Sequence, residues 1–366
     1  MSKTFLLVDF GASRIKTCIY RNSQIESIKD FLPSAPCDTT ERKFVVSLDN
    51  IEKQFREIVA SYCDFYKIDA IYICSEMHGF AVLDKNNNPI SDYISWKDER
   101  CLNCSNGTST FDLLKDKYSE VFYNITGMRP RPCYPFFNLY EYVKNCSQKE
   151  IKIVSLPEFI CTIDDQSTNI SHSTMSAGLG FYDIYKKEFS NYLISIYKDL
   201  GINLLFNKPS DNIVIGGYLC LNHKNIPIYT GVGDHQCAVL GAGNTAETIS
   251  LNLGTGSQVG VIGENSSIAE KRPYFNDEIM SVVTHIPSGR SFNAYINFLY
   301  EVNPDRNFWQ MLSEIKLSEL KLASLDIDLA LFSSAWNFDR YGQIANINEK
   351  KFNFKKLFGF ITKKLC

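Results

Sequence analysis

Apolar and polar residues alternate in two parts of the chain in a way that predicts β-hairpins with glycine at the turn. Residues 4–8 and 15–20 flank the first break, Phe10-Gly11-Ala12-Ser13, and residues 248–253 and 258–262 flank the second, Gly254-Thr255-Gly256-Ser257. Two alternating segments joined by a short Gly-bearing turn are typical of hairpins. Because the same plan occurs twice, we expect two domains, residues 1–244 and residues 245–366.

The segments between the two hairpins predict alternating helices and strands. Residues 49–66 carry apolar side chains at helical spacing and are followed by the buried-strand pattern of residues 70–73. A further hairpin is predicted over residues 81–96 with its turn at 85–89, and a loop over the proline-rich residues 127–135. After the last hairpin, residues 290–300 and 308–315 predict helices. This alternation is typical of an α/β fold.

Composition narrows the class of protein. The 366 residues exceed the usual size of one hydrophobic core, and a hydrophobic share of 45% favours packed domains over disorder. A net charge of -3 gives no strong field for nucleic acid, so no nucleic-acid partner is expected. We also expect no membrane span and, because the N-terminus lacks a cleavable signal, a cytoplasmic location. The one CxxC, Cys101 to Cys104, has no second ligand pair, so zinc is not expected.

Both hairpin tips are suited to holding phosphate. Glycine lets backbone N–H groups approach a phosphate closely, and a neighbouring hydroxyl adds a donor. Gly11 with Ser13, and the Gly254-Thr255-Gly256 turn, have this composition. Asp9 ends the first strand, where a carboxylate can hold magnesium against those phosphates. Each motif also occurs in proteins that bind no phosphate, and turn-capping is the alternative role of Asp9.

Polar and aromatic residues follow two of the predicted strands. Residues 75–79 read Ser-Glu-Met-His-Gly, and residues 96–100 read Trp-Lys-Asp-Glu-Arg. The carboxyl ends of strands form the binding crevice of open α/β sheets, and this mixture of imidazole, indole and charged groups suits a sugar. The alternative is that His78 and Trp96 are ordinary core residues.

Asp234 is the candidate catalytic residue. It lies in the segment Gly231-Val232-Gly233-Asp234-His235-Gln236, between the apolar strand of residues 226–229 and the apolar residues 237–240. A carboxylate at such a junction can act as the general base that phosphoryl transfer to an alcohol requires. Helix N-capping is the alternative, and the local pattern alone favours it.

Taken in order, the motifs LLVDFGASRIKT, EMHG, SWKDER, GVGDHQ and LNLGTGSQ resemble those of the FGGY carbohydrate kinases. The resemblance implies an actin-like (ribonuclease H-like) ATPase fold and the use of ATP with Mg²⁺. It implies that Asp9 holds magnesium and that Asp234 is the base. The residues implied to face the nucleotide phosphates are Gly11, Ser13, Lys16, Gly254, Thr255 and Gly256. Those implied to contact the sugar are Met77, His78, Trp96, Asp234 and His235.

Within that family, Met77-His78 is similar to the ketose kinases such as xylulokinase. The stretch RPYFNDEIMSVVTHIPSGRSFNA is most similar to sedoheptulokinase-like members. We therefore expect sedoheptulose or a related ketose as substrate, with xylulose and ribulose still open. Residues 171–174 depart from the Asp-rich segment that many members carry, so no substrate contact is predicted there.

Members of that family continue beyond the length of this chain, which implies an incomplete second domain without the part that holds adenosine. Residues 352–366 place apolar side chains on one helical face, the kind of surface that the missing part of the second domain should cover. A homodimer partner or a complementing chain is the expected means of completing the ATP site. Two alternatives to an active kinase stay open. One is a weakened kinase that binds sugar or a protein without efficient transfer. The other, an actin-like structural ATPase, is disfavoured by EMHG and SWKDER.

Overall fold

The fold was analysed in a computed structural model that describes residues 3–105, 107–254, 256–264, 269–316, 326–331, 342–345 and 347. Contacts divide the chain into two units. The first comprises residues 1–246, 262–265 and 270–280, and the second comprises residues 247–261, 266–269 and 281–366. Within the described residues, no helix is both long and apolar enough to cross a membrane.

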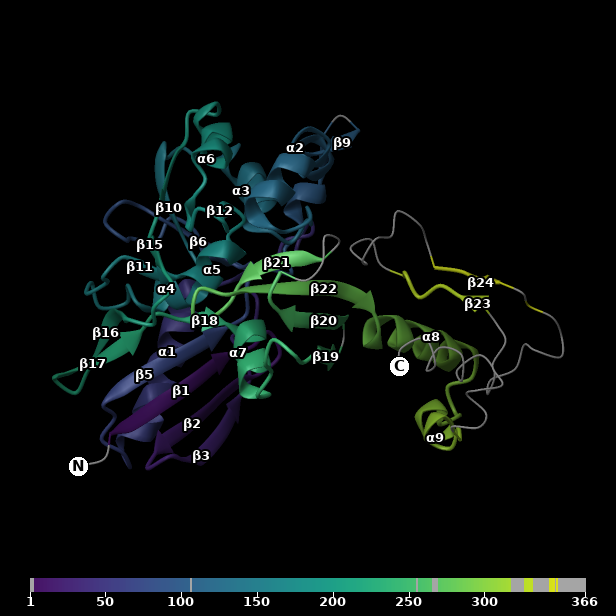
Figure 1. Ribbon diagram of the computed structural model, residues 1–366, viewed down its shortest axis with the longest axis horizontal. Coiled ribbons are helices and arrows are strands. Elements are labelled where there is room, and N and C mark those ends of the chain that lie inside the picture. The colour runs from purple at the N-terminus through teal and green to yellow at the C-terminus, as the bar shows by residue number, and fades with distance from the viewer. Residues whose placement is uncertain are drawn as a thin grey trace. The chain divides into compact units, whose positions relative to one another are not determined.

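A mixed sheet is the centre of the first unit (Figure 1). Its strands are β1 (Thr4–Phe10), β2 (Ile15–Arg21), β3 (Gln24–Phe31), β5 (Ala70–Ser75), β16 (Ile215–Leu221), β17 (Lys224–Tyr229) and β18 (Val232–Gly233). The order is β16-β17-β5-β1-β2-β3, and β18 also pairs with β5. Because β1, β17 and β18 all run parallel to β5, the segments that follow β1, β5 and β18 meet at one edge of the sheet.

Helix α1 (Leu48–Cys63) covers one face of this sheet. Its Ser47 N-cap accepts a hydrogen bond from the backbone N–H of Asn50 at 3.3 Å, and its apolar face packs on the alternate residues of β1 that point inward. The first hairpin is confirmed, since β1 and β2 are antiparallel neighbours. The predicted helix at residues 49–66 and the strand at residues 70–73 are confirmed as well.

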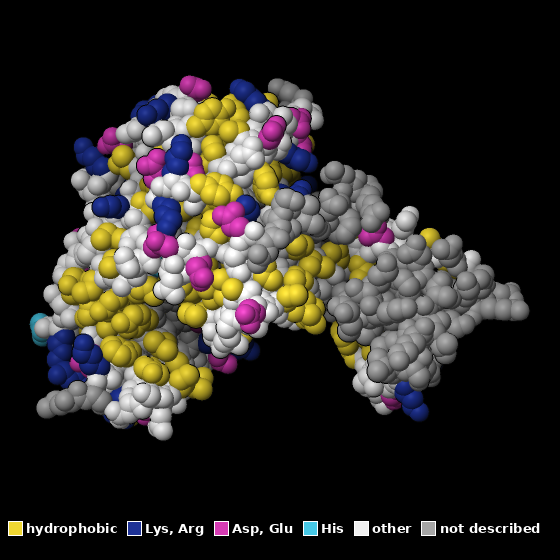
Figure 2. Space-filling view, in the orientation of Figure 1, with side chains coloured by type: hydrophobic (Ala, Val, Ile, Leu, Met, Phe, Trp, Pro, Cys, Tyr) yellow, Lys and Arg dark blue, Asp and Glu magenta, His cyan; other side chains and the backbone are white. Residues whose placement is uncertain are grey.

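The opposite face of the sheet carries a layer of aromatic and aliphatic side chains. The ring of Tyr72 stacks on that of Tyr229 at 4.4 Å and meets Phe5 edge-on at 5.5 Å. Ile28 on β3 is 73% exposed. Figure 2 shows apolar side chains gathered over this part of the molecule. Asp9 of β1 belongs to this face, because it alternates with the inward-pointing Val8 and Phe10.

A second core in the same unit is mainly aromatic. It lies between the sheet β14-β10-β6 and the helices α2, α3 and α6. Their bounds are β6 (Ala81–Leu83), β10 (Glu150–Val154), β14 (Asn203–Phe206), α2 (Thr110–Thr126), α3 (Pro135–Val143) and α6 (Asn191–Lys198). Gly127 ends α2 with φ 72°, a left-handed conformation that glycine adopts without strain. The loop predicted over residues 127–135 is confirmed as far as Tyr134, since Pro135 begins α3.

The predicted hairpin over residues 81–96 is only partly correct. The chain does reverse, with the Asp84 N–H donating to the Asn88 carbonyl at 2.8 Å. Its two arms also pair with each other, through the antiparallel bridges Leu83–Pro89 and Phe80–Ile94. In addition, β6 pairs with β10, and β7 (Tyr93–Ile94) pairs with β4 (Val45–Val46); these distant partners are what local periodicity does not reveal.

Shorter elements complete the first unit and support the site. They are η1 (Arg100–Leu102), β8 (Cys104–Ser105), β9 (Thr108–Ser109), α4 (Leu156–Ile160), β11 (Ile170–His172), α5 (Ser173–Gly178), β12 (Tyr182–Asp183), β13 (Glu188–Phe189), β15 (Lys208–Ser210), α7 (Asp234–Gly241) and β21 (Glu270–Pro273). Among them, α5 packs against both β18 and β21.

The second unit begins with the other predicted hairpin. β19 (Ser250–Leu253) is antiparallel to β20 (Gly256–Ile262), and β20 lies between β19 and β22 (Ile279–Pro287). This hairpin and the two later helices, α8 (Gly289–Val302) and α9 (Phe308–Ser313), confirm the predictions. A short pair, β23 (Asp326–Ile327) and β24 (Ile344–Ala345), follows. Thr255 and the predicted apolar face of residues 352–366 lie outside the described residues.

Candidate active site

Asp9 and Lys16 lie side by side at the end of the first hairpin. They are direct partners in the β1–β2 register, on the face of the sheet that α1 leaves uncovered. The Cys74 thiol of β5 donates to Asp9 Oδ1 at 3.2 Å. Asp9, Lys16 and Cys74 line a groove of about 420 Å³, together with Cys237 of α7. Two residues predicted to serve the nucleotide are thus brought together.

The tip of the first hairpin requires a glycine. The Gly11 N–H donates to the Arg14 carbonyl at 3.1 Å, and a Cβ added at Gly11 would come within 2.9 Å of that oxygen. Ser13, two residues further, is exposed. The tip therefore presents a close-fitting backbone and an accessible hydroxyl, as phosphate binding requires.

Glu76 is a site residue that sequence reasoning missed. Its carboxylate accepts hydrogen bonds from the Tyr93 hydroxyl at 3.0 Å and from Trp96 Nε1 at 3.2 Å. Burial raises the pKa of Glu76 to about 7, although the Tyr93 hydrogen bond and the Lys97 charge lower it, and the Asp234 charge raises it further. A carboxylate directly before Met77, at the end of a buried strand, was the available signal.

The turn that follows Glu76 is strained. His78 has φ 68°, an uncommon left-handed conformation for a side chain of its size. Its Nδ1 is 3.0 Å from the Gly178 carbonyl of α5, and its ring lies 4.6 Å from that of Tyr134. A Cβ added at Gly79 would lie 1.8 Å from the Tyr93 hydroxyl oxygen. Glycine at this position therefore lets Tyr93 reach Glu76.

Met77 and Trp96 have different surroundings. Met77 is 6% exposed, and its side chain reaches the backbone of Gly178 and Gly233, where added Cβ atoms would meet it at 3.6 and 2.8 Å. It therefore joins α5 to β18. Trp96 is 37% exposed and is held through Nε1 by Glu76. Of the two, Trp96 has the more accessible apolar surface for a sugar ring or chain.

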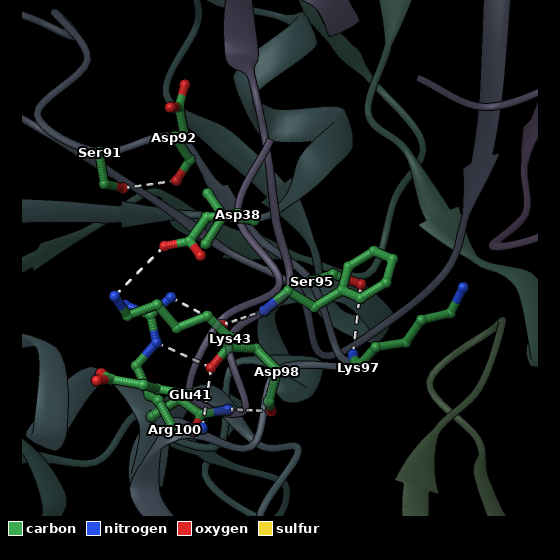
Figure 3. A network of polar contacts seen from close by, with 12 residues as sticks. Asp38, Glu41, Lys43, Ser91, Asp92, Ser95, Lys97, Asp98 and Arg100 are labelled. Carbon is green, nitrogen blue, oxygen red and sulfur yellow. Dashed lines mark hydrogen bonds and ion pairs between the residues drawn. The ribbon is translucent and has the colours of Figure 1, made fainter. Parts of the chain in front are cut away.

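The segment after Trp96 divides into an accessible part and a buried part (Figure 3). Lys97 Nζ donates to the Ala12 carbonyl of the first hairpin at 3.3 Å and lies 4.9 Å from the Phe44 ring centroid. Asp98 is buried, forms an ion pair with Arg100 at 2.8 Å and accepts from the Phe44 N–H at 2.7 Å. Asp98 and Arg100 therefore fix the loop, and Lys97 faces the hairpin.

Asp234 is the first residue of α7, and Gly233 occupies the N-cap position. Its Oδ1 accepts from the His235 N–H at 2.7 Å. Burial raises the pKa of Asp234 to about 6; the His235 hydrogen bond and the Arg272 charge lower it, and the Asp9 charge raises it. Burial and the Arg272 charge lower the pKa of His235 to about 3, so its imidazole is neutral at pH 7. A carboxylate titrating near neutrality is suited to proton transfer.

The segments 172–178 and 270–275 also adjoin Asp234, and the sequence predicted no site residue in them. Thr174 Oγ1 accepts from the Gly233 N–H at 3.1 Å, and Gln236 Nε2 donates to the Pro273 carbonyl at 3.2 Å. Arg272 acts electrostatically on both Asp234 and His235. These contacts connect segments far apart in sequence, so no local pattern indicates them.

The second phosphate motif lies in the second unit. The Gly254 carbonyl accepts from Ser288 Oγ at 2.7 Å and from the Gly289 N–H at 3.1 Å, so the start of α8 holds one side of the turn. Gly256 is exposed, and Ser257 is buried. The turn is open on its glycine side, as the predicted phosphate contact needs.

The donor set near Asp9 fits magnesium bound together with a nucleotide. In the part of the chain that the structure describes, no three His, Cys, Asp or Glu side chains group as metal ligands. Magnesium in phosphoryl-transfer enzymes takes one or two carboxylates and completes its shell with water and phosphate oxygens. Asp9 supplies one such carboxylate ligand. Its charge also raises the pKa of Asp234.

In the central sheet, the antiparallel strands β1, β2 and β3 lie beside β5, which is parallel to β1, and the site lies at one edge of this sheet. This arrangement defines an actin-like α/β ATPase fold. The family description "FGGY family of carbohydrate kinases, N-terminal domain" matches residues 4–241. The chain therefore belongs to the FGGY family of carbohydrate kinases, phosphotransferases that act on sugars. The expected family, fold class and type of enzyme are confirmed.

Solved structures show the same fold. A xylulose kinase from Lactobacillus acidophilus has a TM-score of 0.80 and 17% identity, with 99% of this chain and 76% of that chain covered. A gluconate kinase from the same organism has a TM-score of 0.81 and 17% identity, with 100% of this chain and 76% of that chain covered. Plasmodium falciparum glycerol kinase with ADP has a TM-score of 0.72 and 15% identity, with 99% of this chain and 75% of that chain covered. A search of curated proteins found no match.

Proposed function

We propose that this chain transfers the γ-phosphoryl group of magnesium ATP to a hydroxyl of a ketose, with sedoheptulose as the first candidate and xylulose or ribulose as alternatives. The observation that carries the proposal is the position of Asp234. Its half-buried carboxylate begins α7 at the edge where β1, β5 and β18 end, and the charges of Asp9 and Arg272 both act on it.

In the proposed reaction, Asp234 is the general base. The hydroxyl oxygen of the sugar forms a bond to the γ-phosphorus while the bond from that phosphorus to the β,γ-bridging oxygen breaks, and ADP leaves with the electron pair. The hydroxyl proton passes to the Asp234 carboxylate. A pKa of about 6 keeps this carboxylate mostly ionised at pH 7 and still basic enough to take the proton.

A phosphate contact is proposed for each hairpin taken by itself. In the first unit Lys16 supplies a cation and Ser13 a hydroxyl donor, and Gly11, whose N–H is taken by the Arg14 carbonyl, has no side chain to keep a phosphate away from the backbone. In the second unit the corresponding turn is Gly254-Thr255-Gly256. Asp9 would hold magnesium, which neutralises phosphate charge as the transfer proceeds. This assignment keeps residues 1–244 and 245–366 as the two functional domains.

The sugar would lie against the segments that follow β5 and β18. His78 and Trp96 offer an imidazole and a partly exposed indole, and His235 offers a neutral imidazole beside the base. Met77 is buried and joins α5 to β18, and it thereby supports the segments proposed to contact the sugar. Glu76 holds Trp96 in place. A ketose with several hydroxyls and apolar C–H faces suits this mixture of groups.

The test is calorimetric titration of the purified chain with magnesium ATP, and separately with sedoheptulose and xylulose, followed by a coupled assay of ADP release. Sugar-dependent ADP release supports the proposal and identifies the preferred ketose. Sugar binding without ADP release would instead support the alternative of a binding protein that does not turn over, and would leave a homodimer or complementing chain to be sought by mixing experiments.

A further inference from the structure

Lys97 differs from the neighbouring Asp98 and Arg100 in the direction of its side chain. Asp98 and Arg100 are buried and form an ion pair with each other at 2.8 Å, whereas Lys97 is exposed. Figure 3 shows the Lys97 side chain extended away from that pair. Its Nζ donates a hydrogen bond to the Ala12 carbonyl at 3.3 Å. The segment after Trp96 therefore reaches the tip of the first hairpin through this cationic side chain.

Ala12 is the central residue of that tip. It lies between Gly11 and Ser13, the two tip residues proposed to contact phosphate. Lys97, Gly11 and Ala12 line a cavity of about 210 Å³, and Glu76, which follows β5, lines it as well. The cavity therefore extends from the hairpin tip to the end of β5, where the segment proposed to contact the sugar begins.

Two aromatic rings also hold the Lys97 ammonium group. Nζ lies 4.9 Å from the ring centroid of Phe44 and 5.9 Å from that of Trp96. A cation within about 6 Å of a ring centroid is attracted to the ring, but a ring does not neutralise its charge. Because Trp96 is a proposed sugar contact, the ammonium group contacts both the phosphate hairpin and a residue of the sugar site.

The charge of Lys97 has no counter-charge at close range. A lysine ammonium has three N–H donors, and the Ala12 carbonyl accepts from one of them. In the part of the chain that the structure describes, Lys97 makes no ion pair with a carboxylate. Lys43, the residue before Phe44, does pair with Asp38, at 3.3 Å. The full positive charge of Lys97 and its remaining donors are therefore left for an anion at the hairpin tip.

Phosphoryl transfer supplies such an anion. The negative charge of the transferred group is spread over its three equatorial oxygens, and enzymes stabilise it mainly with positioned cations and N–H donors. The group must lie between the nucleotide phosphates and the sugar hydroxyl while it is transferred. A cation that contacts both the phosphate hairpin and a residue of the sugar site is suited to that position.

We propose that Lys97 Nζ binds an oxygen of the γ-phosphoryl group as this group passes from ATP to the sugar. The inference rests on the proposed function and adds a catalytic residue to it. The ammonium group stays protonated throughout, since the hydroxyl proton passes to Asp234 and ADP leaves with the electron pair. Lys97 therefore compensates charge on the phosphoryl oxygens and takes no part in proton transfer.

The experiment compares Lys97→Met and Lys97→Arg with the wild-type chain. Calorimetry gives the dissociation constants of magnesium ATP and magnesium ADP, and coupled ADP release with sedoheptulose gives kcat/KM for ATP. Loss of a charged hydrogen bond predicts a fall in kcat/KM of about 10- to 100-fold in Lys97→Met. Affinity for ADP, which lacks the γ-phosphoryl group, should change little. Lys97→Arg keeps the charge and should recover most of the loss.

Lys43→Met is the matched control. It removes a positive charge from the residue next to Phe44, but Lys43 pairs with Asp38 and makes no contact with the hairpin tip. Its kinetic constants and nucleotide affinities should equal those of the wild type. Because Lys97 is exposed, Lys97→Met should also melt close to the wild-type temperature. A Lys97→Met variant that melts lower and binds ATP and ADP equally weakly would show that Lys97 only supports the hairpin, and the inference would be wrong.

Failure of this inference and failure of the proposed function give different results. If the wild-type chain phosphorylates sedoheptulose and Lys97→Met retains its kcat/KM, the role of Lys97 is overturned while the proposed function stands. If the wild-type chain binds ATP more tightly than ADP only when Lys97 is present, yet transfers nothing to any sugar, the phosphate contact is supported and the proposed transfer is overturned. If the wild-type chain binds neither nucleotide nor sugar, both are overturned.

Discussion

Replacing Asp234 by Asn tests the proposed base with little change in shape. Asparagine has nearly the same volume and can still accept the 2.7 Å hydrogen bond from the His235 N–H, but it cannot take a proton. General-base catalysis contributes about 10²- to 10⁴-fold to such reactions, so we expect kcat to fall by that factor. Sugar affinity should change far less, because the base acts in the transition state.

The pH dependence gives a second measure of the same group. With a pKa of about 6, Asp234 is roughly 90% ionised at pH 7 and roughly 10% ionised at pH 5, so kcat/KM should fall about ninefold over that interval. A carboxylate at the ordinary value of about 3.9 would remain over 90% ionised at pH 5 and would produce almost no fall. The acidic limb therefore distinguishes a buried base from an exposed one.

The assay is coupled ADP release at saturating magnesium ATP between pH 5 and pH 9, with the coupling enzymes checked at each pH. The reasoning would be refuted if Asp234→Asn retained turnover near the wild-type value, or if kcat/KM for the wild type were unchanged between pH 7 and pH 5. Removing a carboxylate whose folded-state pKa is raised relieves a cost that the folded protein bears above pH 6, so the variant should not melt below the wild type.

Three further predictions concern the surroundings of Asp234. Glu76→Gln removes a group with a pKa of about 7, so any step in the kcat/KM profile near neutral pH should disappear; persistence of that step would assign it elsewhere. Gly79→Ala forces a Cβ to within 1.8 Å of the Tyr93 hydroxyl oxygen, so calorimetry should show weaker sugar binding, and unchanged affinity would mean that the Tyr93–Glu76 contact is dispensable. Glu270→Gln leaves two buried guanidinium groups without a carboxylate and should lower the free energy of unfolding by about 3–5 kcal/mol in urea titrations at pH 7. Burial raises the pKa of Glu270, but the charges of Arg131 and Arg272 lower it to about 2. The stability that Glu270 contributes is therefore complete above about pH 4.5 and is lost as the pH falls toward 2. A difference in unfolding free energy between variant and wild type that stayed constant over this range would contradict the assignment.

Local sequence patterns were sufficient for the parts of the fold that depend on neighbours in the chain. The first hairpin follows from alternation and the Gly11 turn, and α1 follows from its helical spacing and Ser47 cap. The position of Asp234 between the apolar strand of residues 226–229 and the apolar residues 237–240 was likewise visible, whereas the short strand β18 was predicted as a Gly-rich turn. These features need only the preferences of a few consecutive residues.

The features that sequence patterns did not predict all depend on distant contacts. Alternation over residues 81–96 predicted the hairpin contacts but not the pairing of β6 with β10 or of β7 with β4. The charge of Arg272 acts on Asp234 through an arrangement that depends on the packing of β21 against α5 and on the contact of Gln236 with Pro273, neither of which is local in sequence. Glu76 follows a predicted strand, but its role depends on hydrogen bonds from Tyr93 and Trp96, up to twenty residues later. Periodicity contains no information on such pairings.

Two buried carboxylates of the first unit, Glu270 and Asp234, differ in how far neighbouring groups compensate their charge. Glu270 is fully buried, yet two guanidinium groups and a backbone N–H keep it ionised, so it stabilises the fold. Asp234 is partly buried, and burial together with the Asp9 charge raises its pKa more than its backbone hydrogen bonds and the Arg272 charge lower it. The extent to which its negative charge is compensated therefore decides whether a buried carboxylate stays ionised or has a raised pKa. The carboxylate paired with guanidinium groups holds β21 in place, and the one whose pKa is raised is the proposed acceptor of the substrate's proton.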